Sequence, residues 1–455
     1  MFTSTNFSSL HSPANQENIA GILYAALASV DPRLAVEKSI LRQGNYLAVD
    51  GRLYDLNSYR RVLVVGFGKA SVPMAAAIED ILGEKLTAGI VIAKHVEADP
   101  ASRPASKIQV TQGSHPVPDE LSIRATQALM ELSRNCSKED LVICLISGGG
   151  SALCTLPVPG ITLDDLQSLT RLLLKSGAEI GEINTLRKHL DRVKGGGLAR
   201  WLSPAQVVTL IVSDVIGSPL EVIASGPTVA DPSTFAEAIQ ILDKYGLTRQ
   251  IPGAILAYLQ KGLADPSLES VKPGDPALEG VQNLVIASNY QAAQAAADEA
   301  RRRGFNTLLL TTYLHGEAAQ AGMLLASILK QMALTGEPIG RPACVIAGGE
   351  TTVTVQGNGL GGRNLETSLG SVSDLAGVDK VALVSLGTDG EDGPTDAAGA
   401  LVTGETLANA QKLQAAPRRF LADNDSYHFF EQAGGLIKTG PTGTNVNDLA
   451  FLFAF

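Results

Sequence analysis

The chain has 455 residues, of which 45% are hydrophobic and 18% are charged, and its formal net charge at pH 7 is −10. A chain of this length exceeds one ordinary hydrophobic core, so two domains are expected. The negative charge argues against a nucleic acid or an anionic membrane as partner, because both require clustered cations.

The sequence shows no sign of a targeting segment or a membrane span. Its first twenty residues, MFTSTNFSSLHSPANQENIA, have neither the basic region nor the apolar core of a signal peptide. No stretch approaches the roughly 18 continuous apolar residues of a membrane span. The four cysteines form no CxxC pair and no metal-ligand spacing: Cys136, Cys144, Cys154 and Cys344. These features predict a cytoplasmic protein with reduced thiols.

The predicted elements alternate between helices and strands. Residues 14–42 show helical spacing with a break at Pro32, and strand–helix units follow. The predicted strands are the apolar runs at 61–65, 87–93, 141–146, 207–212, 283–287, 306–311, 343–348, 351–355 and 381–386. Helices are predicted between many of them, including 289–303 and 317–334. This pattern favours a doubly wound α/β architecture with largely parallel sheets.

A domain boundary is predicted in residues 264–280, which are rich in Pro, Gly, Asp and Ser and have almost no apolar pattern. We therefore expect a Rossmann-like N-terminal domain over residues 1–270 and a smaller α/β domain over residues 281–455.

Five apolar runs end in loops rich in Gly, Asp, Ser and Thr: 66–71, 147–153, 213–228, 348–352 and 387–399. Open α/β sheets bind ligands at the carboxyl ends of their strands. We therefore expect one active-site cleft between the two domains.

The first loop, GFGKAS, is a glycine turn between a strand and a helix that begins near Ala70. Gly66 and Gly68 let backbone approach a phosphate, and the Lys69 ammonium is placed to neutralise a transferring phosphoryl group. The dinucleotide fingerprint is incomplete, because Ser71 replaces its third glycine and no acid follows the next strand. Lys94 and His95 stand there instead, which leaves an NADP 2′-phosphate open.

The second loop, SGGGSAL, suits a phosphate or a carboxylate. Its backbone N–H groups and hydroxyls come from Ser147, Gly148, Gly149, Gly150 and Ser151. The loop lacks the G-x-S-x-G turn of a nucleophilic serine, so we interpret Ser151 as an anion contact.

Two charged residues follow as catalytic candidates. Asp214 comes shortly after the strand at 207–212, where a carboxylate can hold magnesium or accept a hydroxyl proton. Arg363 lies in the glycine-flanked turn NGLGGRN, and its planar guanidinium suits bidentate contact with a phosphate or carboxylate.

The last two loops supply oxygen and amide groups. Asp389 is nearest to the end of its strand and is preferred over Asp392 and Asp396 as a magnesium ligand. Asn445, in GPTGTNVNDL, is a further candidate contact of the cofactor.

In combination and in order, these loops resemble class II glycerate kinases, the glycerate 2-kinase family with a C-terminal MOFRL domain. The motifs are GFGKAS, SGGGSAL, VSDVIGSPLEVIASGPT, GGETTVTVQGNGLGGRNLE, GTDGEDGPTDAAGA, NDSYHFF and GPTGTNVNDL. The resemblance implies ATP-dependent phosphorylation of D-glycerate at its 2-hydroxyl, giving 2-phosphoglycerate, a Mg²⁺ requirement and two α/β domains flanking the cleft. One departure is GGRNLE, where Leu365 replaces the glutamine of the family pattern.

On this interpretation Lys69 and Arg363 hold the γ-phosphoryl group and the acceptor from opposite domains. Asp214 is the base or a magnesium partner, and Asp389 is a second metal or base candidate. The turn at 147–151 binds the nucleotide phosphates or the glycerate carboxylate. The expected partners are glycerate and a nucleotide, and a homo-oligomer is left open.

The alternative function is an NAD(P)H-dependent hydroxypyruvate reductase, since relatives from tartrate degradation carry that label. Lys94 and His95 would bind the ribose phosphate and His115 would act as the acid. A non-catalytic sugar-acid sensor is a third class, which the complete charged set disfavours.

Overall fold

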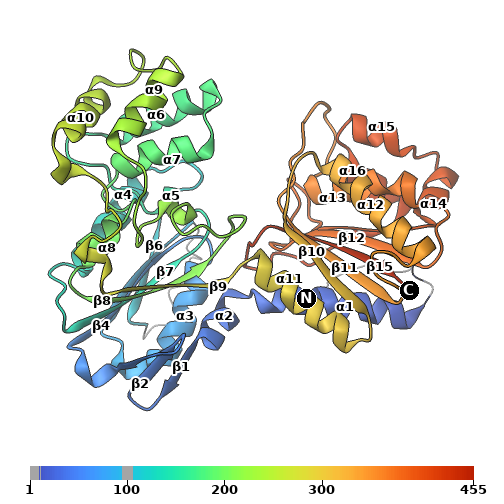
Figure 1. Cartoon of the computed structure of the whole chain (residues 1–455), viewed down its shortest axis with the longest axis horizontal. Coiled ribbons are helices and arrows are strands. Elements are labelled where there is room, and N and C mark those ends of the chain that lie inside the picture. The colour runs from blue at the N-terminus through green and yellow to red at the C-terminus, as the bar shows by residue number, and fades with distance from the viewer. Residues whose placement is uncertain (1–9, 11, 95–105) are drawn as a thin grey trace. The chain divides into compact units, whose positions relative to one another are not determined.

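The computed structural model describes residue 10 and residues 12–94 and 106–455, and it divides the chain into two compact units (Figure 1). The N-terminal unit consists of residues 32–213 and 218–286. The C-terminal unit consists of residues 287–455 together with residues 214–217 and the segment up to residue 31. Both units are discontinuous, whereas the sequence analysis gave each domain one continuous range.

The N-terminal unit is built on a six-stranded sheet in the order β6-β5-β4-β7-β8-β9. The strands are β4 (Arg61–Phe67), β5 (Ala88–Ala93), β6 (Ile108–Gln112), β7 (Asp140–Ile146), β8 (Gln206–Val212) and β9 (Val281–Ala287). The pairs from β6 through β8 are parallel, which confirms the Rossmann-like prediction. Every residue of β7 is buried, including Cys144, because a parallel sheet is covered on both faces.

Helices and a small second sheet complete this unit. Its helices include α2 (Pro32–Ser39), α3 (Ser71–Leu82), α4 (Glu120–Leu132), α5 (Gly150–Leu153) and α8 (Gly197–Leu202). Strands β1 (Ile40–Gln43), β2 (Tyr46–Val49) and β3 (Arg52–Asp55) form an antiparallel sheet that the sequence analysis missed. The predicted helical segment therefore ends at Ser39.

Four helices pack around a separate hydrophobic core in the same unit (Figure 1). They are α6 (Leu163–Ser176), α7 (Ile180–His189), α9 (Phe235–Lys244) and α10 (Gly253–Ala264). Capping boxes at Thr162 and Thr234 begin α6 and α9, because each threonine bonds the backbone three residues on and the acid there bonds back.

The C-terminal unit has a mixed six-stranded sheet in the order β10-β11-β15-β12-β13-β14. The strands are β10 (Asn306–Leu314), β11 (Ala343–Gly349), β12 (Val381–Gly387), β13 (Gly399–Thr403), β14 (Leu436–Ile437) and β15 (Asp448–Ala454). Only β10 and β11 pair in parallel, so the prediction of a largely parallel sheet is wrong for this unit.

The strand predicted at 351–355 is also wrong. That segment makes one isolated bridge, between Thr352 and Glu317. Its backbone bonds to the start of a helix instead of a neighbouring strand: the N–H of Thr352 donates to the carbonyl of Gly316, and the N–H of Thr354 donates to the side chain of Glu317. The β-branched residues favour extended backbone, but the segment joins neither edge strand of the sheet, β10 or β14.

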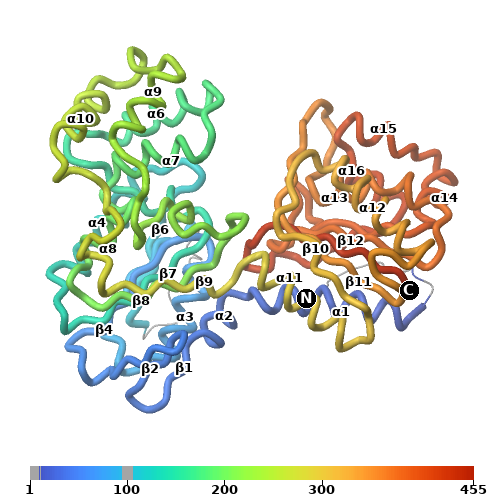
Figure 2. The backbone as a smooth tube through the Cα atoms, in the orientation of Figure 1, coloured from blue at the N-terminus to red at the C-terminus, as the bar shows by residue number. Residues whose placement is uncertain are grey.

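Helices cover both faces of the C-terminal sheet (Figure 1). One face carries α1 (Pro13–Ser29) and α11 (Asn289–Arg302), which run side by side in Figure 2. The other carries α12 (Ala318–Thr335), α13 (Arg363–Leu375), α14 (Thr406–Lys412), α15 (Pro417–Ala422) and α16 (Ser426–Ala433). The helices predicted at 289–303 and 317–334 are thereby confirmed.

Across the residues that the structure describes, no single helix is long and apolar enough to cross a membrane; α1 and α2 meet that requirement only as a bent pair. All four cysteines are buried free thiols.

Candidate functional site

The Lys69 loop and the SGGGS turn lie where the order of the N-terminal sheet reverses. The chain begins this sheet at β4, continues to β5 and β6 on one side, and returns to β7 on the other. The two loops follow β4 and β7 and therefore flank the crevice at their carboxyl ends. Such a switch point is where open α/β sheets bind ligands.

Hydrogen bonds tie these two turns together. The N–H of Lys69 donates to the carbonyl of Gly148 at 2.9 Å, and the N–H of Ala70 donates to Ser147 Oγ at 2.9 Å. Gly68 has φ +129°, and a Cβ there would lie 2.1 Å from Ser147 Oγ. The backbone donors of Lys69 and Ala70 are thus already used within the protein. What the Lys69 turn offers a ligand is its exposed ammonium.

Two residues predicted to contact a cofactor make close contacts inside the protein. Gly66 lies within β4, where a Cβ would meet Leu145 at 2.8 Å. The side chain of Ser147 is 1% exposed, and its hydroxyl accepts the bond from Ala70. Close packing of the two turns accounts for both residues, and their contact with a cofactor stays a prediction.

The exposed part of the SGGGS turn presents donors and lies beside His115. The N–H groups of Gly148 and Gly149 have no acceptor among the described residues. A Cβ on Gly149 would lie 2.9 Å from the His115 ring. Burial lowers the pKa of His115, and the charges of Lys69 and Lys94 lower it further. A neutral imidazole beside two ammonium groups and two backbone donors suits an anion. His95, named for the reductase alternative, lies outside the described residues.

A chain of polar side chains that the sequence analysis missed continues from Ser151. Its Oγ lies 2.5 Å from Ser225 Oγ, which donates to Asn184 Oδ1 at 3.4 Å. Arg187 Nη1 donates to the same Asn184 oxygen at 3.5 Å. No carboxylate of the described residues lies within ion-pair distance of Arg187, and burial lowers its pKa. Helical spacing on α7 was the available signal, since Asn184 and Arg187 are three residues apart.

The loops of the C-terminal unit converge because of β15. This strand runs antiparallel to both neighbours, and its first residue, Asp448, pairs with Gly349 of β11 and Gly387 of β12. The carboxyl ends of β11 and β12 therefore meet the start of β15. Glu350 and Asp389, one and two residues beyond those strands, lie at this edge.

Arg363, the first residue of α13, reaches two carboxylates at this edge. Its Nη1 donates to Glu350 Oε1 at 2.5 Å, and its Nε lies 2.6 Å from Asp448 Oδ2. Asn364 Nδ2 donates to the other Asp448 oxygen at 2.9 Å. Burial raises the pKa of Asp448 to about 7, although Arg363 opposes the rise. The sequence analysis did not select Asp448, whose only signal was an acid that begins the apolar run DLAFLFA.

Asp392 fixes the start of α13. Its Oδ1 accepts from the N–H of Asn364 at 3.0 Å, and its Oδ2 accepts from the N–H of Leu365 at 2.8 Å. The carboxylate thus satisfies donors that a helix start leaves free. The Leu365 side chain is fully buried in the core, so this departure from the family pattern leaves Arg363 in place.

Asp389, the predicted magnesium ligand, is bonded differently from Asp392. It is half-buried, and Asn445 Nδ2 lies 3.4 Å from its Oδ2. No group of three or more His, Cys, Asp or Glu residues in the described ranges gathers to hold a metal. Magnesium bound with phosphates needs only one or two protein carboxylates, and Asp389 as its ligand stays a prediction.

The three predicted catalytic residues fall in both units. Lys69 belongs to the N-terminal unit and Arg363 to the C-terminal unit. Asp214 comes two residues after β8, and with residues 215–217 it belongs to the C-terminal unit.

Two family matches cover most of the chain. Residues 18–260 match a domain of unknown function, DUF4147, and residues 343–448 match the MOFRL family. The D-glycerate 2-kinase of Thermotoga maritima is 42% identical over 416 residues, which are 91% of this chain and 95% of that protein. The chain belongs to the glycerate kinase family.

Other relatives agree on the family but not all carry a kinase name. The glycerate 2-kinase of Pyrococcus horikoshii is 41% identical over 93% of this chain and 94% of its own length. A protein of Agrobacterium vitis named putative hydroxypyruvate reductase is 41% identical over 94% of this chain and 92% of its own length. The crystal structure of a Thermotoga maritima glycerate kinase has a TM-score of 0.87 at 38% identity, covering 98% of this chain and all of its own.

Proposed function

We propose that this chain transfers the γ-phosphoryl group of ATP to the 2-hydroxyl of D-glycerate, giving ADP and 2-phosphoglycerate. The observation that carries the proposal is the switch-point edge of the N-terminal sheet. There the exposed Lys69 ammonium, a neutral His115 and two N–H groups of the SGGGS turn without an acceptor among the described residues lie at neighbouring strand ends. Phosphoryl transfer depends mainly on positioning and charge neutralisation, which these groups provide.

In this reaction Lys69 and Arg363 neutralise the charge that spreads over the transferred phosphoryl oxygens. Glu350 and Asp448 hold the guanidinium of Arg363 on two sides, so its direction is fixed before substrate binds. Asp214 accepts the proton of the attacking 2-hydroxyl. The remaining donors of the SGGGS turn bind either the glycerate carboxylate or a phosphate of the nucleotide.

Asp389 would hold the magnesium ion, with Asn445 beside it. When bound, Mg²⁺ neutralises charge on the β- and γ-phosphate oxygens. Asp392 is less suited to this role, because both of its oxygens hold the backbone at the start of α13.

The reductase alternative is less well supported by the Lys69 turn. A dinucleotide turn binds a pyrophosphate with its backbone N–H groups. Here the N–H groups of Lys69 and Ala70 are already bonded to the SGGGS turn. The name of the Agrobacterium vitis relative nevertheless makes reduction of hydroxypyruvate a defined second outcome of the test.

The test compares the two reactions in parallel. Purified protein is given D-glycerate, ATP and Mg²⁺ in one assay, and hydroxypyruvate with NADH or NADPH in the other. We expect ADP and 2-phosphoglycerate to form in equal amounts, and the nicotinamide absorbance to stay constant. In Asp389→Asn we expect the Mg²⁺ concentration for half-maximal rate to rise about tenfold. Nicotinamide oxidation without ADP would contradict the proposal.

A further inference from the structure

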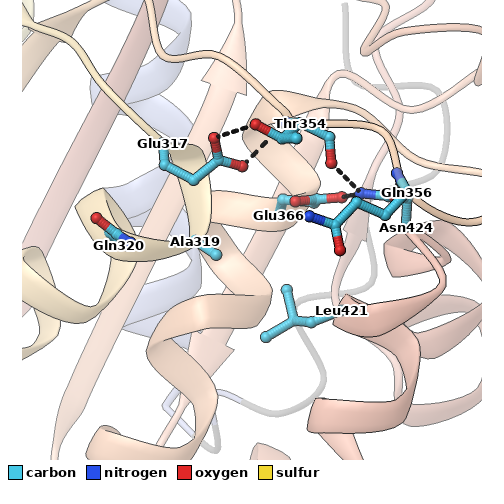
Figure 3. A pocket seen from close by; sticks show the side chains of 8 residues that line it. All are labelled: Glu317, Ala319, Gln320, Thr354, Gln356, Glu366, Leu421 and Asn424. Atoms are coloured by element: carbon cyan, nitrogen blue, oxygen red, sulfur yellow. Dashed lines mark hydrogen bonds between the residues drawn. The ribbon is translucent and has the colours of Figure 1, made fainter.

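A cavity of about 360 Å³ lies in the C-terminal unit, apart from the residues assigned above (Figure 3). It is a hollow open to solvent, between α12, the segment that follows β11, α13 and the end of α15. Eight residues line it: Glu317, Ala319, Gln320, Thr354, Gln356, Glu366, Leu421 and Asn424. Its volume lies within the range of small-molecule sites in proteins.

The lining of this cavity excludes anions. It contains two carboxylates, three amides and one hydroxyl, and no cationic side chain. A phosphate or the glycerate carboxylate would meet like charge without a compensating cation. Its occupant is therefore neutral or cationic, with several hydrogen-bond donors.

Glu366 gives the cavity an acceptor that the protein leaves open. Its side chain is 3% exposed, and its Oε1 accepts a bond from Asn424 Nδ2 at 2.8 Å. Its Oε2 has no hydrogen-bond partner in the described part of the chain. This oxygen is not sealed from solvent, so a ligand in the cavity can donate a bond to it in place of water.

Glu317 lies across the cavity from Glu366 (Figure 3). It is held by the N–H and the hydroxyl of Thr354, both at 3.0 Å. Each carboxylate oxygen keeps a further lone pair for a ligand donor. Ala319 and Leu421 provide apolar surface, which suits a flat ring.

The cavity also lies close to the Arg363 network. Glu366 and Arg363 are three residues apart on α13 and thus on adjacent turns of one helix face. Thr354 belongs to the extended segment that begins at Glu350, which is bonded to Arg363. A ligand in the cavity that carried a chain of phosphates would have Arg363 within reach of that chain.

We propose that this cavity holds the nucleoside part of the phosphoryl donor, with Glu317 and Glu366 accepting bonds from its hydroxyl or amino groups. This inference rests on the proposed function, and it adds where the donor's base and sugar are recognised. A nucleoside combines a flat ring, several donors and no charge, and the other substrate, glycerate, has no such part.

The test separates the nucleoside from its phosphates. Adenosine and inorganic tripolyphosphate are used as competitive inhibitors against ATP, since each carries one half of the donor. Ala319→Leu fills the cavity, and Glu317→Gln removes one charge while keeping the bond to Thr354. We expect Ala319→Leu to weaken the binding of ATP and of adenosine at least tenfold, and Glu317→Gln to weaken it about fivefold. Inhibition by tripolyphosphate should be unchanged in both variants.

The matched control is Glu337→Gln, an exposed glutamate just beyond the other end of α12, where all inhibition constants should stay at the wild-type values. Equal adenosine inhibition in wild type and both cavity variants would overturn the inference. Adenosine binding by calorimetry to the full chain repeats the comparison without glycerate. A failure of the kinase assay therefore remains distinguishable from a failure of the nucleoside site.

Discussion

The two units present opposite charge arrangements at the carboxyl ends of their strands. In the N-terminal unit, Lys69 has no ion-pair partner among the described residues, and His115 beside it is held neutral. In the C-terminal unit, Arg363 lies between Glu350 and Asp448. The positive charge of Lys69 therefore awaits an anion, which a substrate would supply. The positive charge of Arg363 is already paired with carboxylates of the protein.

Because of this difference, removing Lys69 should cost activity alone, whereas removing Arg363 should cost both activity and stability. Removing Lys69 takes away a charge that acts only on a ligand. Removing Arg363 also leaves carboxylates without their cation, and one of them is almost fully buried. Substitutions at the two edges should therefore separate activity from stability.

The largest effect is expected from Lys69→Ala. The turnover number should fall by about 10³-fold or more, because the loss of one cation on a transferring phosphoryl group has effects of that size. The melting temperature should stay at the wild-type value, since the Lys69 ammonium supports no contact in the described structure. Steady-state kinetics and thermal unfolding of the same preparation check both. Wild-type turnover would remove Lys69 from the mechanism.

Arg363→Ala should lose activity on a similar scale and also lose stability. Breaking a buried ion pair by removing one partner costs about 3 kcal/mol. The double variant Arg363→Ala with Asp448→Asn should recover most of that stability and none of the activity. Urea unfolding of both variants measures the recovery. Equal stability in wild type and Arg363→Ala would show that Arg363 does not stabilise the carboxylates of Glu350 and Asp448.

Asp448→Asn should change how stability depends on pH. The folded protein raises the pKa of Asp448 from 3.8 to about 7, mainly through burial, with Asp392 adding to the rise and Arg363 opposing it. The folded state therefore holds the proton more tightly than the unfolded state. This contribution to stability is complete below about pH 4 and is lost as pH rises through about 7.

The free energy of unfolding should accordingly fall by a few kcal/mol more in wild type than in Asp448→Asn between pH 4 and pH 8. Denaturant titrations at several pH values measure the two slopes. Parallel slopes would mean that Asp448 does not titrate in this range.

The smallest effect is expected from Arg187→Met, which keeps length but removes charge. If the hydroxyl chain from Ser151 to Arg187 faces the substrate, the KM for glycerate should rise about tenfold or more, because a bond to a charged group contributes about 1.5–3 kcal/mol. Arg249→Met, at an exposed arginine of the same unit, is the matched control. An unchanged KM would confine Arg187 to a structural role.

The sequence predicted the central strands β4, β5, β7 and β8 of the N-terminal sheet well because they are buried on both faces, whereas the partly exposed strand β6 was missed. Continuous apolar runs that alternate with helices, such as the run in β7, indicate buried strands of a parallel sheet. The same reasoning failed for 351–355, whose composition is that of a strand. Whether such a segment pairs depends on a free neighbouring edge, and the sequence does not contain that information.

Some residues of the candidate site could likewise be predicted from the sequence, and others could not. Lys69, Asp214, Arg363 and Asp389 were selected because each lies in a loop after an apolar run. Asp448 was missed because it begins a strand, and the search followed strand ends only. Only the antiparallel register of β15 brings its first residue beside the last residues of β11 and β12. Asn184 and Arg187 lie on a helix, where charged residues are usually on a solvated face.

The central position of β15 also has a consequence for biosynthesis. The N-terminal sheet has all its strands once residue 287 has been translated, and it can fold while the rest of the chain is still being made. The C-terminal sheet cannot, because β11 and β12 are joined only through a strand that follows every other strand of that sheet in the chain. Until β15 leaves the ribosome, both neighbours have unpaired edges and Arg363 lacks Asp448. The ribosome thus finishes the two halves of this protein at different times, and the half with the arginine comes last.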